Sequence, residues 1–133
     1  MLMTPQTNIP PSVLALAREQ AQSMIDEVTG VTAVVIATVD GFDVASVIRG
    51  SAEAPRIAAM ASSISAISTV VSHEAQLGRN KSVTIDTESG FALVHSVYRQ
   101  DAELVINVIA NSNAILAQVN YRTAQFARLL GNA

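Results

Sequence analysis

The chain has 133 residues, of which 50% are hydrophobic and 14% charged, and its formal net charge is −3 at pH 7. This length fits one domain with a substantial core. The sequence contains no cysteine, which excludes disulfides, thiolate metal sites and cysteine nucleophiles. The charged share is low against about a quarter in an average soluble protein. It therefore favours an oligomer or a stable partner over a well-covered monomer.

The net negative charge, without any basic block, disfavours nucleic-acid binding. Residues 1–11 contain three prolines and show no periodicity, so we expect a flexible tail before a single domain at residues 12–131. This segment lacks the pattern of a signal peptide. The longest dense apolar run, residues 31–39, is shorter than the roughly 20 residues that span a bilayer. We therefore expect a cytoplasmic protein without membrane insertion.

The apolar spacing predicts a first helix, capped by Ser12, that ends near residue 28. Strands are expected at residues 31–39 and 42–48, joined at Asp40-Gly41, which is a strong hairpin signal. Three further strands are expected at residues 81–87, 91–98 and 104–110. A last helix should start at a cap on Ser112 or Asn113 and run to about Leu130, with these residues facing inward: Ile115 or Leu116, Val119, Phe126, Leu129 and Leu130.

The central helix, expected at residues 55–77 with Gly78 as its stop, is the most informative segment. No Lys, Arg, Asp or Glu occurs between Arg56 and Glu74, so the charged outer side of an ordinary surface helix is missing. A row of large residues should pack on the chain's own sheet: Ile57, Met60, Ile64, Ile67 and Val71. A second row, of mostly smaller residues, should face another copy of the same helix: Ala59, Ser63, Ala66, Val70, His73 and Leu77.

The order α-β-β-α-β-β-β-α predicts an α/β (α+β) domain with a five-stranded, mainly antiparallel sheet. Residues 31–39 and 104–110 are apolar on both faces, which is typical of interior strands covered on both sides. Residues 81–87 have one polar face, which indicates either an edge strand or a strand with one exposed side. Three helices can supply the two layers, the central helix on one face and the terminal pair on the other.

This order, with the segments GVTAVVIATVDGFDVAS and LGRNKSVTIDTESGFALVHSV, resembles the roadblock / dynein light chain family, and the bacterial MglB-like branch is the closer likeness. The matching features are Gly30-Val31, Asp40-Gly41 and the Gly78 junction. The resemblance implies a profilin-like three-layer domain. It also implies a homodimer in which the central helices pack side by side and the strand at residues 81–87, with Val83 and Ile85, pairs with its own copy.

The resemblance further implies that the chain binds a Ras-like small GTPase, either as a regulator of its nucleotide cycle or as a scaffold. We expect a protein that is not itself an enzyme. Two alternatives stay open. One is a structural adaptor in a motor, kinase or polarity complex, which a partner without a nucleotide-binding loop would favour. The other is a small-molecule sensor, which the 4% aromatic content disfavours.

No motif predicts catalysis, a cofactor or a metal site. Residues 78–82 lack the Gly directly before Lys81 that a phosphate-binding loop requires. Next to His73 and Glu74, the following helical ligand position is Leu77, which cannot bind metal. His73 is expected to be an interface imidazole rather than a proton-transfer or switch group, and His95 a core or sheet-face residue.

Four cationic residues could contact a partner. Arg99 could act as an arginine finger, which stabilises charge during phosphoryl transfer, but we expect it to be a solvated turn residue. Arg56, Arg79 and Lys81 flank the central helix and could form a rim for a partner, with solubility as the alternative role.

Overall fold

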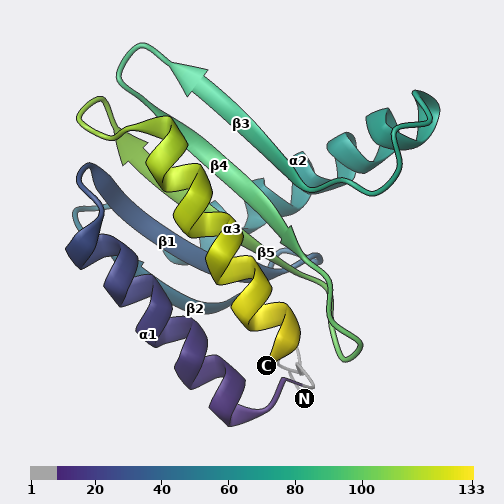
Figure 1. Ribbon diagram of the computed structural model, residues 1–133, viewed down its shortest axis with the longest axis horizontal. Coiled ribbons are helices and arrows are strands. Elements are labelled where there is room, and N and C mark those ends of the chain that lie inside the picture. The colour runs from purple at the N-terminus through teal and green to yellow at the C-terminus, as the bar shows by residue number, and fades with distance from the viewer. Residues whose placement is uncertain (1–8) are drawn as a thin grey trace.

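The computed structural model describes residues 9–133 of the chain (Figure 1). Its elements in chain order are α1 (Pro11–Glu27), β1 (Val31–Thr38), β2 (Asp43–Ile48), α2 (Ala54–Glu74), β3 (Ser82–Thr87), β4 (Gly90–Val97), β5 (Leu104–Asn111) and α3 (Leu116–Asn132). The strands form one five-stranded sheet in the order β2-β1-β5-β4-β3, and each neighbouring pair is antiparallel. The predicted fold class and element order are confirmed.

The two strands that are apolar on both faces, β1 and β5, lie in the middle of the sheet, as predicted. They pair from Val31 opposite Ala110 to Thr38 opposite Leu104, with a bulge near the start of β1. Val34 and Val35 point to opposite faces and are both fully buried. Strand β3 forms one edge of the sheet and is mostly exposed, also as predicted.

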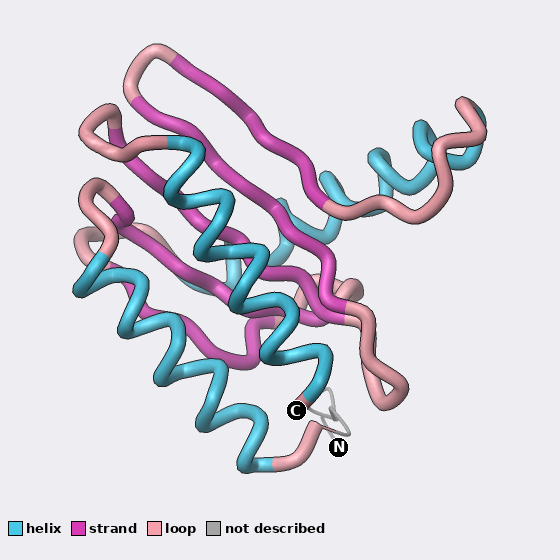
Figure 2. Tube along the Cα trace, in the orientation of Figure 1, coloured by secondary structure: helices cyan, strands magenta, loops and turns pink. Residues whose placement is uncertain are grey.

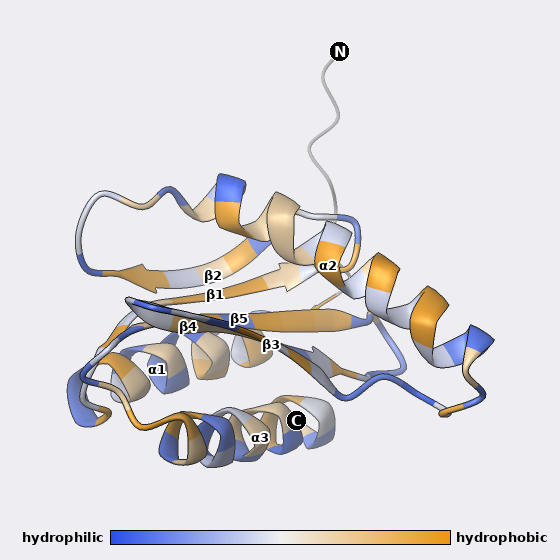
Figure 3. Ribbon diagram, turned by 90° about the horizontal axis from the view of Figure 1, so that it is seen from above, coloured by the Kyte–Doolittle hydropathy of each residue, from blue (hydrophilic) through white to orange (hydrophobic). Residues whose placement is uncertain are grey.

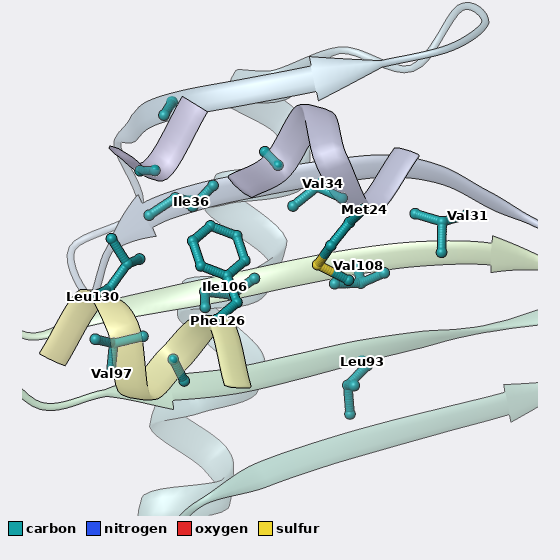
Figure 4. Packing of buried hydrophobic residues seen from close by; sticks show 14 of the residues in the cluster. Met24, Val31, Val34, Ile36, Leu93, Val97, Ile106, Val108, Phe126 and Leu130 are labelled. Carbon is teal, nitrogen blue, oxygen red and sulfur yellow. The ribbon is translucent and has the colours of Figure 1, made fainter. Parts of the chain in front are cut away.

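The helices form the two layers that a sheet with apolar interior strands requires. Helices α1 and α3 lie side by side on one face, and α2 alone covers the other (Figures 1 and 3). In the larger core, Met24 of α1 and Phe126 of α3 meet Ile36 and Ile106 of the sheet (Figure 4). Full burial of one such side chain contributes about 1.5–3 kcal/mol. Because this cluster contains more buried residues than the one under α2, this layer carries most of the hydrophobic stabilisation.

The start of the packed domain differs from the prediction. Pro10, not Ser12, occupies the cap position of α1, without a side-chain cap hydrogen bond. Ile9 is only 5% exposed and belongs to the core. The packed domain therefore begins at Ile9, within the segment that was expected to be a tail, and residues 1–8 of that segment lie outside the described residues.

The start of α3 also differs. Neither Ser112 nor Asn113 caps this helix, which begins after Ile115 without a side-chain cap. The Asn113 N–H instead donates a 3.0 Å hydrogen bond to Asn111 Oδ1, which is local turn chemistry that competes with a cap. Among the residues expected inward, Val119, Phe126 and Leu130 are buried, whereas the side chains of three others are exposed: Ile115, Leu116 and Leu129.

Candidate functional site

Helix α2 packs on the sheet through small residues. Ala58 and Ala61 are fully buried and Ile57 is 5% exposed, and they pack against β1 and β5 residues such as Val35 and Val105. Alanine at the contact lets the helix backbone approach the sheet closely. The helix is long and apolar enough to cross a membrane by length and composition alone. Only its first half, with Ala58 and Ala61, packs into the core of this domain.

The row of large residues on α2 is mostly uncovered, so the prediction that it packs on the chain's own sheet is wrong. Ile57 is buried and Ile64 half-buried. The other three are 51%, 66% and 56% exposed: Met60, Ile67 and Val71. Figure 3 shows the reason: the second half of α2 slopes away past the end of the sheet, with its hydrophobic residues in view. This accounts for Ile67 and Val71, which lie in that half of the helix, but not for Met60, which lies in its first half.

A groove of about 410 Å³ separates α2 from the start of β3. Ile67 and Val71 line it from the helix, and Val83 lines it from the strand. Ser68 also lines it, and its buried hydroxyl has no hydrogen-bond partner among the described residues. Ile67 and Val71 therefore lie on the side of the helix that faces β3.

The edge strand continues this apolar surface. Val83 pairs with Val94, which packs beneath α2, so Val83 and Ile85 both lie on the α2 face of the sheet. Ile85 is 40% exposed. Within residues 9–133, β3 pairs with β4 alone, so its outer N–H and C=O groups are open to another strand.

The row of smaller residues lies on the side of α2 away from the sheet, and all its helical members are exposed: Ala59, Ser63, Ala66, Val70 and His73. Leu77 does not belong to this helical row, because α2 ends at Glu74 and not at residue 77. The helix is terminated at Gln76, whose φ of 57° lies in the left-handed region. The Leu77 N–H bonds the Ser72 carbonyl at 2.8 Å, which closes the helix end before Gly78.

The three residues expected to form a cationic rim do not lie together. Arg56 lies in the first turn of α2, whereas Arg79 and Lys81 follow its end in the loop of residues 75–81 (Figure 2). A helix of 21 residues separates these positions by about 30 Å. Arg79 and Lys81 instead lie near α3, where Arg128 lines the same groove.

Two further predictions concern ionisable residues near the sheet. His95 is half-buried on β4, as expected of a sheet-face residue. Arg99 is not a solvated turn residue: its side chain is 6% exposed, and it binds Asp101 and the last carbonyls of α3. These bonds leave it unsuited to act as an arginine finger. Within the described part of the chain, no three His, Asp or Glu side chains gather into a group that could hold a metal ion.

These features define a class of domain: a three-layer α/β domain whose lone helix and edge strand on one face present a continuous apolar surface. Among solved structures the chain is similar to a roadblock/LC7 domain from Streptomyces avermitilis, at 18% identity over 85% of this chain and 92% of that one, with a TM-score of 0.76. It is also similar to the gliding protein MglB from Thermus thermophilus, at 12% identity over 98% and 96%, with a TM-score of 0.84.

A third similar structure, an MglB with a tetrameric arrangement, shares 13% identity over 98% of this chain and 96% of that one, with a TM-score of 0.82. A scan against family models and a search of curated proteins give no match. At these identities the likeness establishes the fold. The chain has the roadblock fold, and the resemblance found in its sequence is confirmed at that level.

Proposed function

We propose that the chain is a cytoplasmic, non-enzymatic homodimer that binds a Ras-like small GTPase and acts as its regulator or scaffold. The observation that carries the proposal is the apolar surface that runs from Ile67 and Val71 across the groove to Val83 and Ile85. Soluble monomers rarely leave so continuous an apolar surface uncovered. A surface next to an open strand edge fits a second copy of the chain, because edge pairing and apolar burial then occur together.

The proposed dimer pairs β3 with its own copy and brings the two α2 helices together above that junction. Because Ile67 and Val71 lie on the β3 side of α2, we place the helix contact on the row of large residues. The row of small residues then borders the contact and faces away from the sheet, where a partner can approach. The competing arrangement, with Ala59, Ser63 and Ala66 in the contact, stays a prediction from the sequence.

The GTPase partner is supported by the roadblock resemblance, which the fold similarity strengthens. The test is sedimentation equilibrium of the full chain, alone and mixed with a candidate small GTPase loaded with GDP or a GTP analogue. A dimer that binds one nucleotide state preferentially supports regulation through the switch regions, and turnover assays then separate activation from exchange. A dimer that binds both states equally supports the adaptor function instead. A monomer contradicts the dimer proposal.

A further inference from the structure

A second groove, of about 490 Å³, lies between α3 and the edge formed by β3 and β4. It is separate from the apolar groove beside α2, which no residue of α3 lines. Its walls come from three regions: Arg79 and Lys81 before β3, His95 and Tyr98 at the end of β4, and Arg128 on α3.

This groove collects most of the cations that the fold leaves without an ion pair. The chain has eight Lys and Arg residues. In residues 9–133, three of them pair with carboxylates: Arg49 with Asp26, Arg99 with Asp101, and Arg122 with Glu27. Of the remaining five, three line this groove (Arg79, Lys81 and Arg128), and no Asp or Glu of the described residues lines it. A chain of net charge −3 thus concentrates positive charge at one concave site.

One cationic side chain of the groove, that of Arg79, is held in place by a contact within it. The Arg79 guanidinium carbon lies 3.6 Å from the centre of the Tyr98 ring, which is a cation–π contact. The Tyr98 hydroxyl donates a 2.6 Å hydrogen bond to the Asn80 carbonyl, which fixes the ring beside the loop. An ordered guanidinium loses less side-chain entropy when it binds a ligand.

His95 lies where the charges of the groove converge. Its Nδ1 is 3.0 Å from the Ser96 carbonyl, so Nε2 is the ring nitrogen left for a ligand. Burial lowers the pKa of His95, the hydrogen bond to Ser96 opposes this, and the charges of Arg128 and Lys81 lower it further. Arg128 of α3 and Lys81, in the loop just before β3, therefore act on one imidazole, and an anion bound between them would offset their repulsion.

The remaining lining indicates the kind of anion. Val97, Ala124, Ala127 and Gly131 contribute an apolar part of the wall, which a free inorganic anion cannot use. Three cations are also few for a nucleic-acid site, since such sites often make about 6–10 phosphate contacts. A peptide that carries both carboxylates and aliphatic side chains complements both parts of the wall.

We propose that this groove binds an acidic peptide segment of a partner protein, with its carboxylates on Lys81 and Arg128 and its apolar side chains against α3. The site lies on the α1–α3 side of the sheet. The proposal for this site does not depend on the proposal for the α2 surface. It would let one chain hold a second partner while α2 and β3 are occupied.

The test measures binding of a fluorescein-labelled peptide of alternating glutamate and leucine to the full chain by fluorescence anisotropy. Arg128→Glu should weaken binding by about tenfold or more, since a charged hydrogen bond is lost and a repulsion added. Arg18→Glu is the matched control: it makes the same charge change on α1, beside α3, at an exposed arginine with no ion pair in residues 9–133. The control should bind like the unmodified chain. Equal weakening in both variants would show non-specific attraction and overturn the proposal.

A second measurement tests whether the peptide binds in this groove and needs no variant. In NMR spectra of the unmodified chain, the peptide should raise the pKa of His95 and shift the amide signals of Ala127 and Gly131. Shifts confined to other elements would contradict the site. Inorganic phosphate and a short DNA duplex serve as competitors. Displacement of the peptide by either, at the peptide's own concentration, would assign the groove to phosphate chemistry and overturn the peptide assignment.

Discussion

Arg99 and Asp101 form a two-point ion pair in the turn between β4 and β5. The guanidinium Nε and Nη2 each lie 2.8 Å from a different carboxylate oxygen. The third nitrogen, Nη1, donates to the Leu130 carbonyl and, at 3.3 Å, to the Ala133 carbonyl at the end of α3. One side chain thus ties the β4–β5 turn to the last helix. A cation also interacts favourably with the C-terminal end of a helix dipole.

Replacing Arg99 with alanine should lower the free energy of unfolding by about 1–3 kcal/mol, because hydrogen bonds from a charged donor to the end of α3 are lost. Urea unfolding followed by circular dichroism measures this. Arg99→Lys should restore only part of the loss, since an ammonium cannot make the two-point contact. Arg56→Ala, at an exposed position without an ion pair in residues 9–133, is the control and should change little. An unchanged midpoint for Arg99→Ala would show that the contact does not stabilise the fold.

His95 should make the stability depend on pH in one direction. Burial lowers its pKa in the folded chain, so the unfolded chain binds more protons once the pH falls below about 6.5. Stability should therefore decrease as the pH falls through that value, until the folded-state pKa is passed. His95→Gln should remove this part of the slope. His73→Gln, on the exposed side of α2, should retain it. Urea midpoints measured across this range provide the comparison, and a slope retained in His95→Gln would assign it to other groups.

The strands and layers could be predicted because their signals are local. Runs that are apolar on both faces require a covered, central position, and β1 and β5 have it. The orientation of α2 could not be predicted in the same way. Helical spacing shows which residues share a face, but it does not show which face meets the sheet. Ala58 and Ala61, whose small side chains allow close approach, pack on the sheet, whereas Ile67 is exposed.

The groove beside α3 illustrates a second limit. Lys81 and Arg128 are far apart in the sequence: the pairing of β3 with β4 places Lys81 next to His95, and the packing of α3 beside β4 brings Arg128 there. The same holds for Arg99, whose partners include carbonyls of the last helix. No local pattern shows where such residues lie: from the sequence we expect Arg99 to be a solvated turn residue, and Lys81 to be either part of a rim for a partner or a solubilising residue.

At the end of α2, we predict that one substitution stabilises the chain and that another destabilises it. Gln76 adopts a left-handed conformation, which costs a residue with a Cβ about 1 kcal/mol or more. Gln76→Gly should therefore stabilise the chain by about 0.5–1 kcal/mol. Gly78 has a φ of 84° with open space around it, so Gly78→Ala adds backbone strain without a clash and should destabilise by a similar amount. Thermal unfolding of both variants is the measurement. A loss of stability in Gln76→Gly would show that the Gln76 side chain contributes more than its backbone costs.

The position of the helix contact in the proposed dimer can be decided with two adjacent residues. Ile67 is 66% exposed on the β3 side of α2, and Ala66 is exposed on the side away from the sheet. If the large residues form the contact, Ile67→Arg buries an unpaired charge there. A buried charge without a partner costs several kcal/mol, so the dimer should dissociate. Ala66→Arg should then leave the dimer intact in sedimentation equilibrium. The sequence-based arrangement, with the small residues in the contact, expects Ala66→Arg to dissociate it. Each variant alters one exposed position of the same helix, so neither should unfold the monomer. A dimer that survives both changes would show that association does not use α2.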